Sequence, residues 1–165
     1  MNPVVTAAVV LVALGCSSSP KPAPVTAAGV RALLAATHEV DYPDEHFSVQ
    51  DTATTPDGFT AAVGVRDPSG DGKGMVVAFW HNGTFVGLAQ DFEVLAVSAV
   101  DSSGPGRFTV SYVNYRASDP LCCPSGAPRV LPIGYHWTGK RFVADKPLPE
   151  NLYRPPAERV VTPHS

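Results

Sequence analysis

A period of two between apolar and polar residues recurs along the chain after residue 58 and predicts antiparallel strands. Turn-rich stretches such as 67–74 and 101–106 divide this pattern into short segments. The strongest turn signal is Asn82-Gly83, because an Asn-Gly pair readily takes positive φ at both central positions of a type I′ turn. Strands are therefore predicted on both sides of this turn, and the main candidates are 59–66, 75–80, 92–100, 107–116, 130–137 and 141–144.

Residues 25–38 carry the period of a helix instead, since Val30, Leu33, Leu34 and Thr37 fall on one face. The expected fold is α+β and mainly β. It consists of a small antiparallel sheet or partly closed barrel of about six or seven strands, with one N-terminal helix.

The beginning of the chain predicts export. Residues 4–14 form an uncharged, nearly continuous apolar run that fits a signal peptide and is too short to span a bilayer. The run ends in Ala13-Leu14-Gly15-Cys16, which resembles a bacterial lipobox and implies cleavage before Cys16 and lipidation of its sulfur. The alternatives are a conventional secretory signal cut near Gly15, or a buried apolar segment.

The expected organisation follows from these patterns and from the prolines of the C-terminal tail. It comprises a lipoprotein signal peptide at 1–15, a lipidated Cys16 with a Ser/Pro tether at 16–24, a single domain at 25–149 and a proline-rich extended tail at 150–165. Lipidation would hold the domain on the outer face of the cytoplasmic membrane, as a cell-envelope protein.

Composition narrows the function classes. The 12 Lys and Arg residues against 15 Asp and Glu give a net charge of −3, and without a basic cluster this argues against nucleic acid as a partner. The 17 prolines and 14 glycines argue against a helical bundle, because both residues disfavour helix interiors.

The adjacent pair Cys122-Cys123 is the most distinctive feature of the mature chain. Export favours oxidation, and with Cys16 assigned to lipid no other cysteine is left within the chain. Neighbouring side chains of an extended segment point to opposite sides, which opposes a bond between these two. A vicinal disulfide, two free thiols and intermolecular pairing therefore all stay open.

Other motifs give little support for catalysis. Asp67-Pro-Ser-Gly-Asp-Gly72 matches the first half of a calcium loop, but Ala78 stands where the bidentate glutamate belongs, so a plain hairpin loop is favoured. The five histidines lack metal-ligand spacing, and no serine lies in a G-x-S-x-G elbow. We therefore expect no enzyme, no metal and no cofactor.

The favoured hypothesis for function is a non-enzymatic module that presents a β-sheet face or loops to a partner, with exposed aromatic residues making the contacts. The candidate residues are Trp80 and Trp137, which flank turns, together with Tyr112 and Tyr115, and the alternative is that these rings fill the core. The protein would then be a non-enzymatic binding or structural module for an envelope protein, a glycan or a lipid. The rival hypotheses are a thiol–disulfide redox enzyme using Cys122-Cys123 and a lipid carrier with an apolar pocket.

Three segments carry a resemblance to a known family. They are Phe79-Trp-His-Asn-Gly-Thr-Phe-Val-Gly87, Asp119-Pro-Leu-Cys-Cys-Pro-Ser-Gly126 and Tyr135-His-Trp-Thr-Gly-Lys-Arg-Phe-Val143, followed by Pro147-Leu148-Pro149. Together they resemble the LppP/LprE lipoproteins of mycobacteria and related actinobacteria. The resemblance implies an exported, lipid-anchored envelope protein, and it supplies no catalytic residues.

Overall fold

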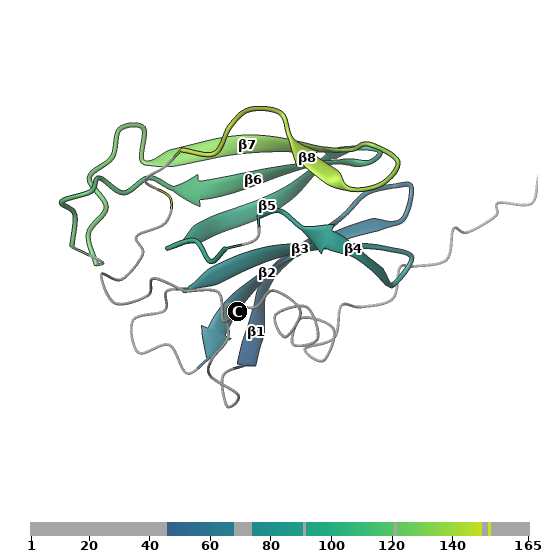
Figure 1. Cartoon of the computed structure of the whole chain (residues 1–165), viewed down its shortest axis with the longest axis horizontal. Coiled ribbons are helices and arrows are strands. Elements are labelled where there is room, and N and C mark those ends of the chain that lie inside the picture. The colour runs from purple at the N-terminus through teal and green to yellow at the C-terminus, as the bar shows by residue number, and fades with distance from the viewer. Residues whose placement is uncertain (1–45, 68–73, 91, 121, 150–151, 153–165) are drawn as a thin grey trace, which may run out of the picture.

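The computed structural model describes residues 46–67, 74–90, 92–120, 122–149 and 152. Eight strands form two four-stranded antiparallel sheets, in the orders β1-β2-β3-β4 and β5-β6-β7-β8 (Figure 1). The strands are β1 His46–Thr54, β2 Phe59–Asp67, β3 Met75–His81, β4 Thr84–Leu88, β5 Val97–Gly104, β6 Arg107–Val113, β7 Val130–Trp137 and β8 Phe142–Ala144.

The two sheets share one apolar core that draws residues from both. Phe79 of β3 lies at its centre, with its ring centroid 4.3 Å from Phe142 and 5.6 Å from Phe108, which both belong to the other sheet. Alternate residues of each strand point inward, so that Val63 and Val77 in one sheet and Val110 and Ile133 in the other are almost fully buried. The apolar area buried between the sheets holds them together.

The turn at Asn82-Gly83 has the conformation that the sequence predicts. Asn82 has φ 48° and Gly83 has φ 81°, so both central residues are left-handed. Beyond the turn, Trp80 pairs with Phe85 and His81 with Thr84. The local signal alone therefore identifies the β3–β4 hairpin correctly.

Two strands differ from their prediction. β1 lies where no strand was expected. Its pairing is irregular between Val49 and Asp51, and this irregularity interrupts the period of two by which strands are predicted. β5 begins at Val97 rather than at residue 92 and continues through the polar residues 101–103, which were assigned to a turn. β5 is an edge strand with one face in water, which is why polar residues fit there.

The mainly β prediction is confirmed, but the predicted single sheet or partly closed barrel of six or seven strands is replaced by eight strands in two separate sheets. The described residues contain no helix that is long and apolar enough to cross a membrane. The predicted signal peptide, tether and helix at 25–38 lie outside the described residues. In the predicted tail at 150–165, Leu152 is described; it is buried, and its carbonyl accepts the Leu95 N–H at 3.0 Å.

Candidate functional site: the loop between β6 and β7

A long ordered connection joins β6 to β7 and contains the two adjacent cysteines. We call residues 114–129 the Cys-pair loop. In Figure 1 it projects from one end of the molecule, opposite the β3–β4 and β7–β8 hairpins. Asn114 closes its base: the Asn114 N–H donates to the Arg129 carbonyl at 2.9 Å, and its side-chain Nδ2 donates to the Pro128 carbonyl at 2.8 Å. These hydrogen bonds therefore tie the two ends of the loop to each other, between the end of β6 and the start of β7.

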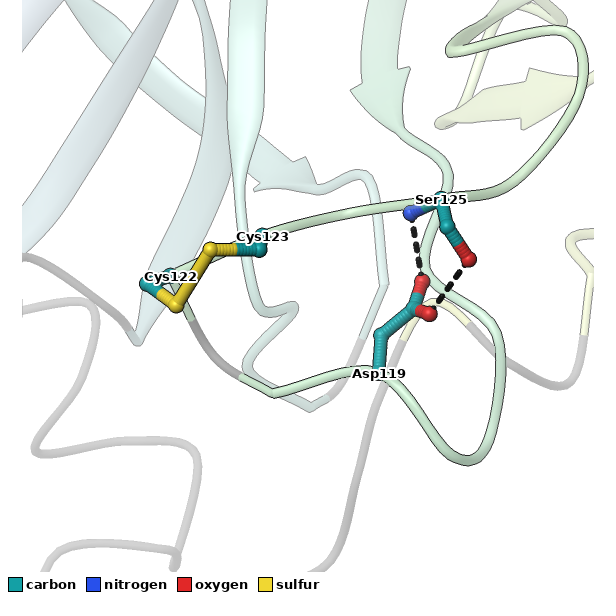
Figure 2. Close-up of a disulfide and its surroundings, with 4 residues drawn as sticks. All are labelled: Asp119, Cys122, Cys123 and Ser125. Carbon is teal, nitrogen blue, oxygen red and sulfur yellow. Dashed lines mark hydrogen bonds between the residues drawn. A yellow bond between two sulfur atoms is a disulfide. The ribbon is translucent and has the colours of Figure 1, made fainter.

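Asp119 organises the middle of the Cys-pair loop. Its carboxylate accepts hydrogen bonds from the Ser125 hydroxyl at 2.5 Å and the Ser125 N–H at 2.7 Å (Figure 2). It also accepts the Arg116 N–H at 2.7 Å. The side chain is buried, with 6% of its surface exposed, although the residues around it are exposed. These donors, those of Ser125 first, hold the pKa of the Asp119 carboxyl below its usual value, and the nearby Arg116 charge adds to the effect.

The two cysteines lie on the outside of this arrangement. The structure joins the sulfur atoms of Cys122 and Cys123 in a vicinal disulfide, with Cα atoms 3.8 Å apart, and both residues are exposed (Figure 2). The Cys123 N–H donates to the Pro120 carbonyl at 3.0 Å, so the pair lies in a turn rather than in an extended segment. In a turn, neighbouring side chains need not point to opposite sides, so the argument against a bond between the two cysteines no longer applies. The redox state of this pair in the cell stays a prediction.

The close packing of the Cys-pair loop also explains why residue 126 is a glycine. Its N–H donates to the Asn114 carbonyl at 3.1 Å, and a Cβ at this position would collide with both the side chain and the carbonyl of Asn114. The Asp-Pro-Leu-Cys-Cys-Pro-Ser-Gly block thus contains an acceptor, its main donor and a residue needed for close approach, as well as the two cysteines. Sequence reasoning selected the block for its cysteines and missed the link between Asp119 and Ser125. The signal that could have found it is an Asp at the start of a proline-containing turn, followed by a Ser.

The charges of the Cys-pair loop are unevenly distributed. Asp119 is the loop's one acidic residue in the sequence, and it is buried and engaged. The loop's two cationic residues, Arg116 and Arg129, are exposed. The loop therefore presents cationic and apolar groups to solvent in a protein whose net charge is −3.

The four aromatic residues proposed as a binding surface do not form one. Tyr112, Tyr115 and Trp80 are 0%, 3% and 5% exposed. Trp137 is half-buried, and its ring packs against Phe142 with centroids 5.4 Å apart. The alternative that these rings fill the interior is the one that the structure supports, because large apolar rings gain most free energy by leaving water.

A buried polar network was not anticipated from the sequence. The Tyr112 hydroxyl lies 2.7 Å from the Tyr135 hydroxyl and donates to Gln90 Oε1 at 3.2 Å. Burial raises the pKa of Tyr135 to about 12, and burial together with the neighbouring Tyr135 raises the pKa of Tyr112 further. Gln90 Nε2 is buried and has no hydrogen-bond partner among the described residues. Residues 22 and 23 positions apart in the chain meet here, so no local pattern could have revealed the network.

The remaining sequence motifs bring no metal site together in the part of the chain that the structure describes. Residues 68–73 of the calcium-like segment lie outside the described residues. His136 Nδ1 lies 2.6 Å from Asp145 Oδ1, an exposed pair across β7 and the residues after β8. Within the described ranges, no three His, Cys, Asp or Glu side chains are close enough together to hold a metal ion.

The fold and this loop define a class of protein: a two-sheet antiparallel β domain with an ordered, exposed Cys-pair loop. The family model of the LppP/LprE lipoproteins matches residues 51–140, which is more than half of the chain and includes the whole Cys-pair loop. The chain belongs to this lipoprotein family. No curated protein and no solved structure matches it. Membership of a lipoprotein family associates the protein with the membrane of the cell envelope.

Proposed function

We propose that this protein is a lipid-anchored envelope module without catalytic activity, which binds a partner protein through the Cys-pair loop. The observation that carries the proposal is that this exposed loop is fixed internally, by Asn114 at its base and by buried Asp119 in its middle. A surface ordered before binding loses less conformational entropy when a partner docks. The exposed Arg116 and Arg129 add side chains of a type enriched at protein interfaces, and they favour an acidic partner surface.

The interior of the domain supports a surface role over carriage of a lipid. A carrier holds its cargo in an apolar cavity of several hundred Å³. Here the space between the sheets contains the stacked rings of Phe79 and Phe142 and the side chains around them. Three of the four aromatic residues that could have formed an exposed platform, Tyr112, Tyr115 and Trp137, pack in or against this interior. Trp80 is buried in a separate cluster of the sheet β1–β4.

The proposal is tested by photo-crosslinking in intact cells. A photoreactive amino acid replaces Ser118 in the Cys-pair loop, and the matched control replaces exposed Lys140 in the β7–β8 turn. We expect a discrete crosslinked partner from position 118, absent from position 140 and lost when Asp119→Ala is added. The same set of products from both positions would contradict the proposal.

A second candidate function is thiol–disulfide exchange, and the exposure of both cysteines favours it. The Cys122–Cys123 bond would accept two electrons and two protons from a partner dithiol, giving two thiols here and a disulfide there. Its test is the oxidation of a reduced dithiol peptide, measured for the wild type and for Cys122→Ser. Stoichiometric oxidation by the wild type alone would favour this candidate over the binding module.

A further inference from the structure

The sheet β1–β4 has a second apolar face, turned away from the core that it shares with β5–β8. In β3, Val77 and Phe79 point into the shared core, while Val76, Ala78 and Trp80 belong to a separate cluster. We call this separate group the outer-face cluster, and it consists of Phe47, Ala62, Val76, Ala78 and Trp80, with Leu88 packed against it.

The outer-face cluster is buried, although the other sheet packs on the opposite side. Ala62 and Trp80 are 1% and 5% exposed, whereas Val49 and Phe85 on the same sheet are 37% and 41% exposed. An antiparallel sheet with one face in water alternates apolar and polar residues, but β3 has six consecutive buried residues. Among the described residues, the apolar side chains packed on the cluster come from this sheet itself. This face therefore calls for a covering element from elsewhere.

The shape of the face favours a helix. Ala62 pairs with Ala78 across β2 and β3, and Gly64 pairs with Val76, so small residues occupy the middle of the sheet. Larger side chains flank them, with Phe47 in β1 and Trp80 towards the β3–β4 turn. A shallow apolar surface of this kind accepts the curved side of a helix, which is about 10 Å across.

We infer that residues 25–38 of the same chain are the occupant, packing as a helix with Val30, Leu33 and Leu34 against the outer-face cluster. Chain continuity supports this choice, because β1 of the same sheet begins at His46. The seven residues 39–45 span up to about 23 Å when extended, while the outer strands of a four-stranded sheet lie about 15 Å apart. The connection therefore reaches any part of the face.

The length and width of a helix at 25–38 match the buried part of the outer face of β1–β4. Fourteen helical residues are about 21 Å long, within the length of about 30 Å of a nine-residue strand such as β2. A single helix covers the centre of the sheet and leaves its margins in solvent, as Val49 and Phe85 are. Alanines at 27, 28, 32, 35 and 36 keep the helix narrow and favour helix formation.

Docking would also set the orientation of the domain, and this consequence rests on the lipid anchor of the proposed function. Only residues 17–24 then separate Cys16 from the docked helix, which is about 25 Å of extended polyproline-like chain. The outer face of β1–β4 would be held close to the membrane. The docking itself does not depend on the anchor, so it is measured both in membranes and in the Cys16→Ser protein.

The test uses the full-length chain, expressed with its own leader and carrying a photoreactive amino acid at Leu33 or, as a control, at Ala35. These positions lie about 200° apart around a helix, so only the first faces the sheet. We expect an intramolecular crosslink from position 33 to the tryptic peptide 74–107, placed within 76–80 by fragmentation, and at least a tenfold lower yield from position 35. Equal yields, or a crosslink from position 33 to a second copy or to another protein, would overturn the inference. Failure of partner capture at Ser118 leaves this result unaffected.

A second measurement uses Trp80 as a reporter in a Trp137→Phe background. Leu33→Asp would place a charge on the apolar face of the helix, so we expect the Trp80 emission to shift to longer wavelength and its quenching by acrylamide to increase. Ala35→Asp should leave both unchanged. Unchanged emission in both variants would overturn the docking.

Discussion

Asp119 is the side chain on which the order of the Cys-pair loop most directly depends. It accepts hydrogen bonds from Arg116 and Ser125, on either side of the cysteines, and these hold its pKa below the usual value of about 3.8. A carboxyl whose pKa is lower in the folded than in the unfolded state adds to the free energy of unfolding at any pH above the unfolded-state pKa. This stabilisation is lost as pH falls through the folded-state pKa.

We therefore predict that the Ser125 amide of the wild type stays protected from hydrogen exchange down to about pH 4 and loses protection below it. Asp119→Asn should expose this amide at neutral pH and lower the melting temperature, while Asp101→Asn on exposed β5 should do neither. Native-state hydrogen exchange followed by mass spectrometry measures the protection, and thermal unfolding gives the melting temperature. Equal protection in wild type and Asp119→Asn at pH 7 would contradict this role.

We expect the two paired tyrosines to differ in their contribution to stability, because the Tyr112 hydroxyl lies between Tyr135 and Gln90. Tyr112→Phe leaves two buried groups without a partner and should lower the free energy of unfolding by about 1–3 kcal/mol. Tyr135→Phe leaves the Tyr112–Gln90 hydrogen bond in place and should cost about 1 kcal/mol. Urea unfolding of both variants gives the comparison, and an equal or reversed order would show that the network is not arranged in this way.

The same tyrosines predict loss of stability in alkali. Their folded-state pKa values lie above the usual value of 10, and that of Tyr135 is raised to about 12. Above pH 10 the unfolded chain releases these protons while the folded protein keeps them, so the free energy of unfolding falls as pH rises. Urea midpoints between pH 9 and 11.5 should decline less steeply for the double variant Tyr112→Phe/Tyr135→Phe. The same slope in both proteins would contradict the assignment.

At the level of elements, the β3–β4 hairpin depends on its turn. Gly83 has φ 81°, a conformation that a residue with a Cβ adopts at a cost, so Gly83→Ala should lower the free energy of unfolding by about 1–2 kcal/mol. The control is Ser102→Ala at an exposed position of β5. A glycine without positive φ, such as Gly134 in β7, is less suitable as a control, because a Cβ there would meet the Asp145 carboxylate. Denaturant unfolding measures both, and equal effects of the two substitutions would contradict the turn assignment.

The elements also explain which predictions were accurate. The pattern of apolar residues between turns found β2, β3, β6 and β7, where each residue has a neighbour on both sides of its strand. It missed β1 and found only residues 97–100 of β5; both are edge strands with polar residues and irregular pairing. Edge strands are specified by what they pair with, so their own sequences carry a weaker signal.

For the whole molecule, the decisive prediction is the attachment of lipid at Cys16. Wild-type protein should partition into the detergent phase, and Cys16→Ala should appear in the aqueous or secreted fraction, because acyl chains contribute about 0.8 kcal/mol per buried CH₂. Cys122→Ala serves as the control and should partition like the wild type. Wild type and Cys16→Ala together in the aqueous fraction would exclude the anchor.

The sequence by itself determined the features that depend on neighbouring residues. The Asn82-Gly83 turn follows from local backbone preference, and the strands of the sheet centres follow from short apolar or alternating runs between turns. The Asp119–Gly126 block was also recognisable, and with the flanking hairpins it indicated the family correctly, because these motifs consist of residues that are contiguous in the chain.

Only the tertiary structure decided how distant segments meet. The two separate sheets, the burial of Trp80, Tyr112 and Tyr115, and the Gln90 network all depend on contacts between residues far apart in the chain. Asp51 accepts the Val100 N–H at 3.0 Å across 49 positions, and no period of two or 3.6 residues encodes such a contact. Periodicity reports which side of a strand is apolar, whereas the partner that covers that side is chosen by packing in three dimensions.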